Sequence, residues 1–363
     1  IKRRFVLKNG EIEAIPTSLG SAFKSKLIGF KTISSILKEP FVSPKLEEEE
    51  SLADFSRRRF GTQIFDDFIT PFITGIYAGD PEKMSMDYTL SILKEAEREY
   101  GSILKGMPKI MKAKKLENEA AGLPKQKVFS FKNGLQDLID ALKKVISAEA
   151  KLSTTVIEIA KKAKGYSIVY EEEGQQKTIE VDEIISTLPA FSLAALIQNE
   201  APKLAEKLNT INYTNAVVLH FGFSKKEVGF NKEAFGVLSR KAENVPFLGI
   251  LFNSRFFPHT SNDPNKELIT VICGGSRYPE LIRKDNAEIK EEVLASLKEV
   301  LNLKAAPHFS KLTKWQNGIP QYELGYAAIE KEIENFHTKN SNFHLLGNYY
   351  KGISVSDCIK NAI

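Results

Sequence analysis

The sequence predicts a mixed α+β (α/β) fold divided over more than one domain, and three observations support this. The chain has 363 residues, a length typical of two or three domains. Hydrophobic residues make up 42% and charged residues 27%, a balance that excludes collagen-like, disulfide-scaffold and wholly disordered classes. Helical periodicity dominates residues 19–127, whereas alternating apolar segments recur from residue 128 onward.

The N-terminal part predicts a β-hairpin followed by helices. Asn9-Gly10 lies between apolar segments within 4–16, which is a strong hairpin signal. An acidic run opens an amphipathic helix within 46–60, and helical periodicity continues to residue 104. The Lys-rich section that follows, 105–127, contains three residues that we expect to break helices: Pro108, Gly122 and Pro124.

From residue 128 onward, helices and strands alternate. Apolar residues at helical spacing predict helices over 135–146, 190–207 and 287–301. Runs rich in β-branched and aromatic residues predict strands over 128–131, 154–159, 166–170, 178–181, 183–187, 216–223, 235–238, 248–252, 268–273, 309–315 and 343–346. No internal repeat is visible in the sequence.

Charge and cysteine content exclude several classes of partner. The 51 basic and 46 acidic residues give a formal net charge of +5, without the clustered stripe that binds nucleic acid. Cys273 and Cys358 are the only cysteines, so we expect no disulfide framework and no zinc cluster, and a cytoplasmic location fits. The histidines lack metal-ligand spacing, so we expect no metal. The Lys-rich section 105–127 fits a solvated face or an anionic membrane surface.

The end of the chain carries the most specific local signal. Residues 345–359 indicate a short strand, a turn that contains Gly347 and Gly352, and the start of a helix. Such a junction aims free backbone N–H groups at an anion or an electron-rich carbonyl. The sequence contains no G-x-S-x-G elbow and no P-loop.

Several segments occur in an order that is more specific than any one of them. They are Arg4-Phe5, Ala14-Ile15-Pro16-Thr17-Ser18-Leu19, Arg57-Arg58-Arg59-Phe60-Gly61, Gly75-Ile76-Tyr77-Ala78-Gly79-Asp80-Pro81, Phe131-Lys132-Asn133-Gly134-Leu135, Ile319-Pro320-Gln321-Tyr322-Glu323-Leu324-Gly325 and the stretch 345–359. In this order they resemble the protoporphyrinogen oxidase family, which belongs to the flavin amine oxidase superfamily. Asn133 departs from the family pattern, which has glycine at that place.

The resemblance implies an amine-oxidase-like FAD fold of the glutathione-reductase-2 type, with a Rossmann-like FAD-binding domain. The implied parts are a β-rich substrate-binding part over 1–18 and 205–325, a helical part over 19–127, and an FAD-binding part over 128–204 and 326–363. The family's G-x-G-x-x-G, which holds the FAD pyrophosphate, has no counterpart here. Together with a first residue other than Met and a last helix cut short, this predicts an N-terminally truncated chain with an incomplete FAD domain.

The resemblance also implies which residues meet cofactor and substrate. The residues implied for FAD are Val156, Trp315, Gly347, Asn348, Ser354 and Val355. Those implied for the substrate are Arg4, which would bind a propionate carboxylate, and Phe235, Gly236, Leu238 and Ile272, which would line an apolar cavity. Without the resemblance, the alternative interpretation is an ordinary surface arginine for Arg4, a core residue for Trp315 and a core strand for 235–238.

The reaction that the resemblance implies is the FAD-dependent oxidation of protoporphyrinogen IX to protoporphyrin IX in haem biosynthesis. Hydride passes from the macrocycle to the flavin, and molecular oxygen is the final acceptor. Because the flavin carries the redox chemistry, no catalytic constellation of side chains is required. The sequence leaves open coproporphyrinogen III as the substrate, an amine oxidase or carotenoid-type desaturase, and a folded fragment that holds no flavin. It also leaves open a homodimer and peripheral contact with the inner face of the cytoplasmic membrane.

Overall fold

The computed structural model describes residues 4–16, 25, 27–46, 48–122, 128–146 and 150–363. The chain forms two compact units. Unit 1 consists of Ile1–Lys144 and Thr214–Gly318, and unit 2 consists of Val145–Tyr213 and Ile319–Ile363. The expected helical part and most of the expected substrate-binding part therefore share one unit, and the division into three functional parts stays a prediction. The residues 17–19 of one family-like segment lie outside the described residues.

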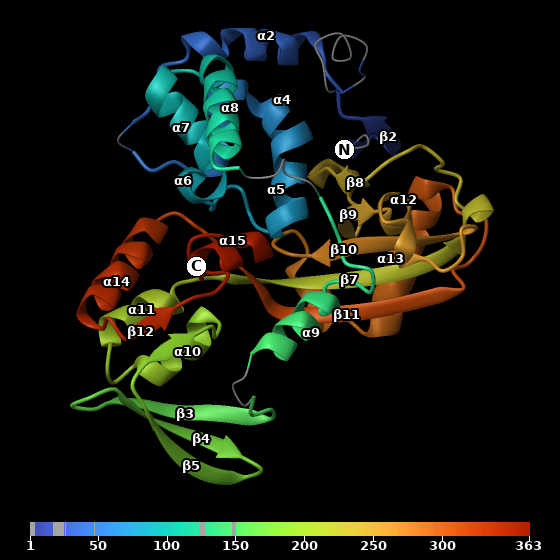
Figure 1. Cartoon of the computed structure of the whole chain (residues 1–363). Coiled ribbons are helices and arrows are strands. Elements are labelled where there is room, and N and C mark those ends of the chain that lie inside the picture. Colours follow the sequence, from blue (N-terminus) through green and yellow to red (C-terminus); the bar gives the residue numbers. More distant parts are fainter. Residues whose placement is uncertain (1–3, 17–24, 26, 47, 123–127, 147–149) are drawn as a thin grey trace. The chain divides into compact units, whose positions relative to one another are not determined.

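Unit 1 contains a seven-stranded sheet in the order β11-β7-β10-β9-β8-β1-β2 (Figure 1). β1 runs parallel to β8, while β1–β2, β8–β9, β9–β10 and β10–β7 are antiparallel pairs. The predicted hairpin is confirmed, because Asn9 and Gly10 adopt the positive φ values, 54° and 76°, of a tight two-residue turn. The strands are β1 (Arg4–Lys8), β2 (Glu11–Ala14), β7 (Tyr213–Ser224), β8 (Gly236–Ser239), β9 (Phe247–Leu251), β10 (Lys266–Gly274) and β11 (Phe309–Pro320).

The two faces of this sheet have different roles, because side chains alternate along each strand. One face is packed in the core with α13 (Asn286–Leu301), whose apolar stripe is buried. The opposite face is the one to which Leu238 of β8 belongs, and α5 (Thr70–Tyr77) packs against β8 and β9 there. The residues of the core face include Phe5, Leu7, Leu219, Phe221, Val237, Ile250 and Val271.

The described residues between β2 and α9 are mainly helical, as predicted. Its helices pack around a core of their own, centred on Leu52, Phe55 and Ile73. One segment of this section is a π-helix, a form often found at functional sites. The elements are α2 (Phe30–Lys38), η1 (Glu39–Phe41), α3 (Leu52–Phe60), α4 (Thr62–Ile64), the π-helix η2 (Phe65–Ile69), α5, α6 (Met86–Thr89), α7 (Ser91–Tyr100), α8 (Ile103–Ala120) and α9 (Gln136–Val145).

Unit 2 combines an antiparallel meander with a short parallel pair of strands. The meander has the order β3-β4-β5, and β6 pairs parallel with β12, so that Leu345 lies opposite Ser186. Its strands are β3 (Thr154–Lys161), β4 (Tyr166–Glu172), β5 (Gln175–Val181), β6 (Ile184–Ser186) and β12 (Phe343–Leu345). Its helices are α10 (Ala190–Ile197), α11 (Pro202–Asn209), α14 (Tyr326–Lys339) and α15 (Val355–Asn361).

The remaining short helices lie in connections of unit 1. They are η3 (Lys225–Glu227), η4 (Lys241–Glu243), α12 (Asn253–Phe256), η5 (Pro258–Thr260) and η6 (Pro279–Arg283). Within the described ranges, no helix combines the length and the apolar character needed to cross a membrane.

Three local predictions were wrong. Residues 128–131 form no strand, and Val128 and Phe129 are exposed. The expected single helix over 190–207 is split into α10 and α11, because Pro202 starts a new helix and Ala201 before it is non-helical. Pro108 does not break α8, which runs through it from Ile103 to Ala120.

The start of α8 is capped by a buried carboxylate from another element. Glu39 accepts hydrogen bonds from the backbone N–H groups of Ile103 (2.8 Å) and Leu104 (3.1 Å) and from the Ser102 hydroxyl (2.6 Å). Glu39 is fully buried and also pairs with the buried Arg59 at 3.3 Å. The carboxylate thus supplies acceptors and negative charge where the helix N-terminus needs both.

This arrangement predicts that Glu39→Gln destabilises the protein by about 2–3 kcal/mol, because it removes one partner of a buried ion pair and one acceptor. Denaturant unfolding measures the change. Glu48→Gln is the matched control, since Glu48 is 75% exposed and pairs only with Lys45, so its effect should stay below about 0.5 kcal/mol. Equal losses in the two variants would contradict the capping role.

Candidate functional site

The strand register gathers four of the five expected substrate residues on one face of the unit 1 sheet. Arg4 lies opposite Gly236, and Leu238 and Ile272 each lie opposite Gly249. Residues directly opposite each other point to the same face, and so do residues two apart on one strand. Arg4 is exposed, while Leu238 and Ile272 are half-buried.

The fifth expected substrate residue, Phe235, immediately precedes β8 and is half-buried. Its ring contacts Phe256 edge-on, with ring centroids 4.6 Å apart. The strand expected over 235–238 is present as β8, which begins one residue later at Gly236. The roles of all five residues toward a substrate stay predictions.

Two glycines make the middle of this face flat. A Cβ at Gly236 would lie 2.4 Å from the Ile250 carbonyl oxygen, and one at Gly249 would lie 3.2 Å from the Val237 carbonyl oxygen. Sequence analysis identified Gly236 but not Gly249, which only the pairing of β9 with β8 and β10 brings to the same face. A surface between one cation and the aliphatic side chains of Leu238, Leu251 and Ile272 suits an apolar ligand that bears an acid.

Helix α5 closes one side of the face through another glycine. A Cβ at Gly75 would lie 2.5 Å from Cδ2 of Leu238, so α5 approaches β8 more closely than a side chain would allow. The next residue, Ile76, is exposed. The segment 75–81 carried part of the family resemblance, but its sequence gave no sign that Gly75 faces Leu238.

His220 belongs to the same face and was missed by sequence analysis. Thr270 of β10 lies opposite His220 of β7, and the His220 Nδ1 is 2.8 Å from the Thr270 hydroxyl. Burial, with a smaller contribution from Lys311, lowers the pKa of His220, so the ring is neutral at pH 7. The alternation of β7 was the signal that could have placed it.

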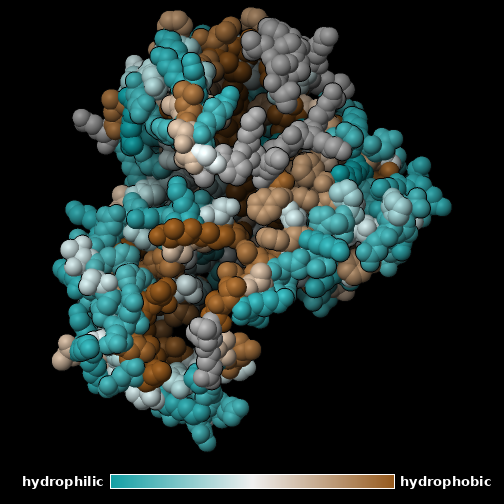
Figure 2. Space-filling model, in the orientation of Figure 1, coloured by the Kyte–Doolittle hydropathy of each residue, from teal (hydrophilic) through white to brown (hydrophobic). Residues whose placement is uncertain are grey.

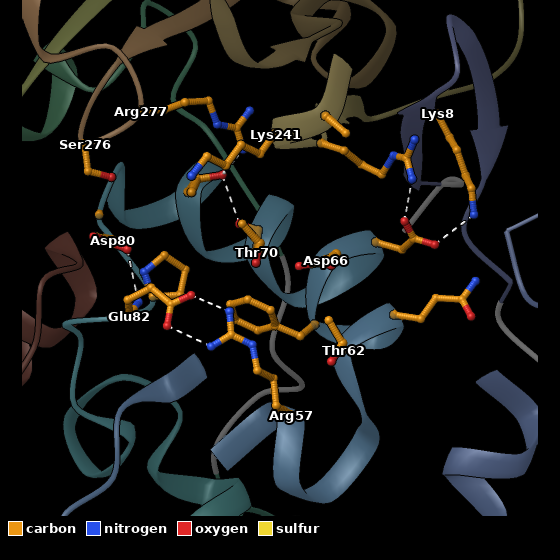
Figure 3. A pocket seen from close by; sticks show the side chains of 18 residues that line it. Lys8, Arg57, Thr62, Asp66, Thr70, Asp80, Glu82, Lys241, Ser276 and Arg277 are labelled. Atoms are coloured by element: carbon orange, nitrogen blue, oxygen red, sulfur yellow. Dashed lines mark hydrogen bonds and ion pairs between the residues drawn. The ribbon is translucent and has the colours of Figure 1, made fainter. Parts of the chain in front are cut away.

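A separate cavity of about 900 Å³ lies in unit 1 beside α5 and is lined by charged side chains (Figure 3). Asp67 of the π-helix bonds both Lys8 (2.8 Å) and Arg240 (2.6 Å), and Arg57 pairs with Glu82 (2.8 Å). None of the expected substrate residues lines this cavity. The lining residues come from segments far apart in sequence, and two of these segments, 57–61 and 75–81, carried part of the family resemblance.

The residues expected at FAD gather mostly in unit 2. The parallel strands β6 and β12 end beside each other, and Gly347 follows β12 with φ of 141°, a conformation that favours glycine. The predicted helix start is confirmed, since Ser354 caps α15 and Val355 is its first residue. Val156 lies on β3, half-buried. Trp315 belongs to unit 1, where it is 57% exposed, so the alternative of a core residue is wrong.

One tyrosine holds the turn between β12 and α15, and sequence analysis did not identify it. The Tyr322 hydroxyl donates to the Asn348 carbonyl oxygen (3.0 Å) and accepts from the Gly352 N–H (2.9 Å). Gly352 has φ of 132°, again a glycine conformation, and the buried Tyr326 donates its hydroxyl to the Tyr349 carbonyl oxygen. The side chains of Tyr322 and Tyr326 thus hold the backbone of this turn in place.

This part of unit 2 has the features of a nucleotide-cofactor site. In open α/β sheets, ligands bind beyond the carboxyl ends of parallel strands, which is where Gly347 lies. The buried Ser186 hydroxyl, at the end of β6, and the buried Tyr349 hydroxyl have no hydrogen-bond partner among the described residues. Burial raises the pKa of Tyr349, so its hydroxyl stays protonated. These two hydroxyls without a partner, together with the backbone at Gly347, fit the binding of a polar group such as a flavin nucleotide.

Comparison with known proteins decides the family. The model of the flavin containing amine oxidoreductase family matches residues 9–363. The chain belongs to this family. Membership confirms the expectation of a flavoenzyme that works as an oxidoreductase with FAD as cofactor, and it confirms the resemblance on which the site residues were assigned.

Three proteins of similar sequence have porphyrinogen oxidase names. A protoporphyrinogen oxidase of Dictyostelium discoideum is 32% identical, with 98% of this chain and 77% of that protein covered. Protoporphyrinogen oxidase 2 of Arabidopsis thaliana is 29% identical, with coverage of 99% and 75%. A coproporphyrinogen III oxidase of Bacillus subtilis is 24% identical, with coverage of 97% and 74%.

Solved structures confirm the predicted fold class. A protein of Exiguobacterium that carries the provisional name protoporphyrinogen oxidase superposes with a TM-score of 0.81 at 19% identity, covering 99% of this chain and 78% of that one. A putrescine oxidase bound to putrescine gives a TM-score of 0.61 at 11% identity, with coverage of 96% and 76%. The amine-oxidase-like FAD fold is therefore shared across both.

The Tyr322 contacts predict that Tyr322→Phe weakens FAD binding about tenfold, because the variant leaves Gly352 N–H and Asn348 C=O without their partner. Titration of the full-length protein with FAD, followed by flavin absorbance, measures the affinity. Tyr170→Phe is the control, as it removes a tyrosine hydroxyl from β4 in the same unit. Indistinguishable FAD affinities for the two variants would show that Tyr322 does not organise the turn for the cofactor.

Proposed function

We propose that this flavoenzyme oxidises a porphyrinogen, and specifically protoporphyrinogen IX to protoporphyrin IX, with molecular oxygen as the final acceptor. The observation that carries the proposal is the flat sheet face with Arg4 at one end and the aliphatic Leu238 and Ile272 beside it. Bound FAD would accept hydride from the saturated macrocycle. Names of the similar proteins support the same substrate class.

In this proposal the protein binds and orients the macrocycle. The Arg4 guanidinium binds a propionate carboxylate, for which its planar fork of donors is suited. Gly236 and Gly249 let the macrocycle lie against the strands, and Leu238 and Ile272 exclude water from its face. On the cofactor side, Val156, Gly347, Asn348, Ser354, Val355 and Trp315 keep their proposed contacts to FAD.

Coproporphyrinogen III is the alternative substrate, supported by the similarity to the Bacillus subtilis enzyme. That macrocycle carries more propionates and would need more cations to anchor it. Along the two described rows that cross the face, from Arg4 to His220 and from Val6 to Val218, Arg4 is the permanent cation. The face therefore favours the substrate with fewer carboxylates.

The function predicts that protoporphyrinogen IX bleaches the flavin absorbance of the FAD-loaded full-length protein under anaerobic conditions, faster than coproporphyrinogen III does. In Arg4→Ala the KM for protoporphyrinogen should rise at least tenfold with little change in kcat, because a charge-assisted hydrogen bond to the ligand is lost. Stopped-flow absorbance and steady-state turnover give both quantities.

Arg283→Ala is the matched control, because Arg283 is 80% exposed and pairs only with Glu280. A flavin that neither porphyrinogen reduces would overturn the proposed function. A normal KM in Arg4→Ala, with flavin content retained, would leave the function standing and refute the role of Arg4. Faster reduction by coproporphyrinogen III would reverse the substrate assignment.

We also propose that the surface around α2 contacts an anionic membrane. Phe30 is 87% and Phe41 is 85% exposed, and Lys31 and Lys38 lie between them in sequence. Figure 2 shows apolar side chains at the top of the view, where α2 lies. Exposed aromatic residues combined with lysines are typical of helices that bind at a membrane interface. A homodimer stays a prediction.

Phe30→Ser combined with Phe41→Ser should therefore reduce binding to phosphatidylglycerol-containing vesicles at least tenfold, since each phenylalanine loses apolar burial. Vesicle flotation measures the bound fraction. Phe309→Ser, which alters an exposed phenylalanine on β11, should bind as the unsubstituted protein does. Equal binding of the double variant and this control would refute the contact.

A further inference from the structure

The charged cavity beside α5 has no role in the proposed reaction, yet its size suits a ligand. Its volume of about 900 Å³ is within the range of sites that hold small molecules. Side chains reach it from α3 to α5, from the turn after β8 and from the turn after β10 (Figure 3). None of the residues assigned to the macrocycle or to FAD is among its lining residues.

Most of the charges in this cavity neutralise one another. Lys8 and Arg240 share Asp67, Arg240 also pairs with Glu243, and Arg57 pairs with Glu82. Two cations among the described lining residues form no ion pair with a carboxylate. They are Arg277, in the turn after β10, and Lys241, which is exposed in the turn after β8.

Arg277 is held firmly, but only by neutral oxygens. Its guanidinium donates to the Ser239 carbonyl oxygen (3.0 Å), to the Ser239 hydroxyl (2.9 Å) and to the Thr74 hydroxyl (3.2 Å). These bonds fix the plane of the guanidinium between β8 and α5. Burial lowers the pKa of Arg277, with Tyr278 opposing the shift, which is what an uncompensated cation in a partly desolvated place shows.

The unused donors of Arg277 match an oxyanion. A guanidinium has five N–H donors, and the bonds to Ser239 and Thr74 occupy three of them. The remaining two donors, with the full positive charge, are free for a ligand in the cavity. A carboxylate accepts two such bonds side by side and supplies the missing negative charge.

We propose that Arg277 is the anchor of a carboxylate-binding subsite in this cavity, with Lys241 as a second cation. The acidic Asp66 and Asp80 also line the cavity, so a polyanion would be repelled. The ligand class is therefore a monocarboxylate whose body carries N–H or O–H donors for these acids. The proposal does not depend on the proposed porphyrinogen oxidation.

The test uses N-acetylglycine, which has one carboxylate and one N–H donor, and N-acetylglycinamide, its uncharged analogue. Saturation-transfer NMR on the FAD-loaded full-length protein measures their affinities. We expect N-acetylglycine to bind at least tenfold more tightly than the amide. In Arg277→Gln, which removes the charge and keeps a polar side chain, N-acetylglycine should bind at least tenfold more weakly.

Arg277→Lys keeps the charge without the planar fork and should show intermediate affinity, and Arg283→Gln should bind as the unsubstituted protein does. The comparison of acid with amide needs no variant, so the proposal remains testable if Arg277→Gln fails to fold. Equal affinities for acid and amide, or equal affinities of the Gln variant and the unsubstituted protein, would overturn it. Displacement of N-acetylglycine by protoporphyrin IX would overturn the assignment of the subsite to a monocarboxylate other than the macrocycle, and a lack of displacement would support that assignment.

Discussion

The candidate substrate face depends on the parallel pairing of β1 with β8. This pairing joins residues 4–7 to residues 236–239, across more than half of the chain. It places Arg4 opposite Gly236 and sets which residues of β1 share a face with Leu238. Because a shift by one residue would send every side chain to the other face, the register of this single pair decides whether a cation stands beside a flat apolar surface.

The sequence predicted what is local and what repeats with a clear period. Asn9-Gly10 specifies its hairpin within a few residues, and the alternation of the later strands is strong enough to identify each of them. The errors came where long-range contacts decide. No described strand pairs with the apolar residues 128–131, and α8 continues through Pro108, with its first turn bonded to Glu39 from another element.

The candidate sites show the same limit. Motif order was enough to propose roles for Arg4, Gly347 and Val355, since each lies in a segment that carries the family resemblance, and these roles stay predictions. Gly75 and Tyr322 lie in family-like segments, but their contacts, like those of Gly249, are with other elements, so the sequence did not indicate what they do. The charged cavity could not be predicted from the sequence for the same reason, because Lys8, Asp67 and Arg240 come from three distant segments and meet only in the folded chain.

The close approach of Gly75 to Leu238 limits which residues position 75 can hold. A side chain at position 75 would clash with Leu238, since even a methyl group there would lie 2.5 Å from Cδ2 of Leu238. A mutation at this position would turn Leu238 or lift α5, and either movement would reshape the apolar surface without altering Arg4 or the strands. This one helix position therefore limits the shape that the apolar surface around Leu238 can take.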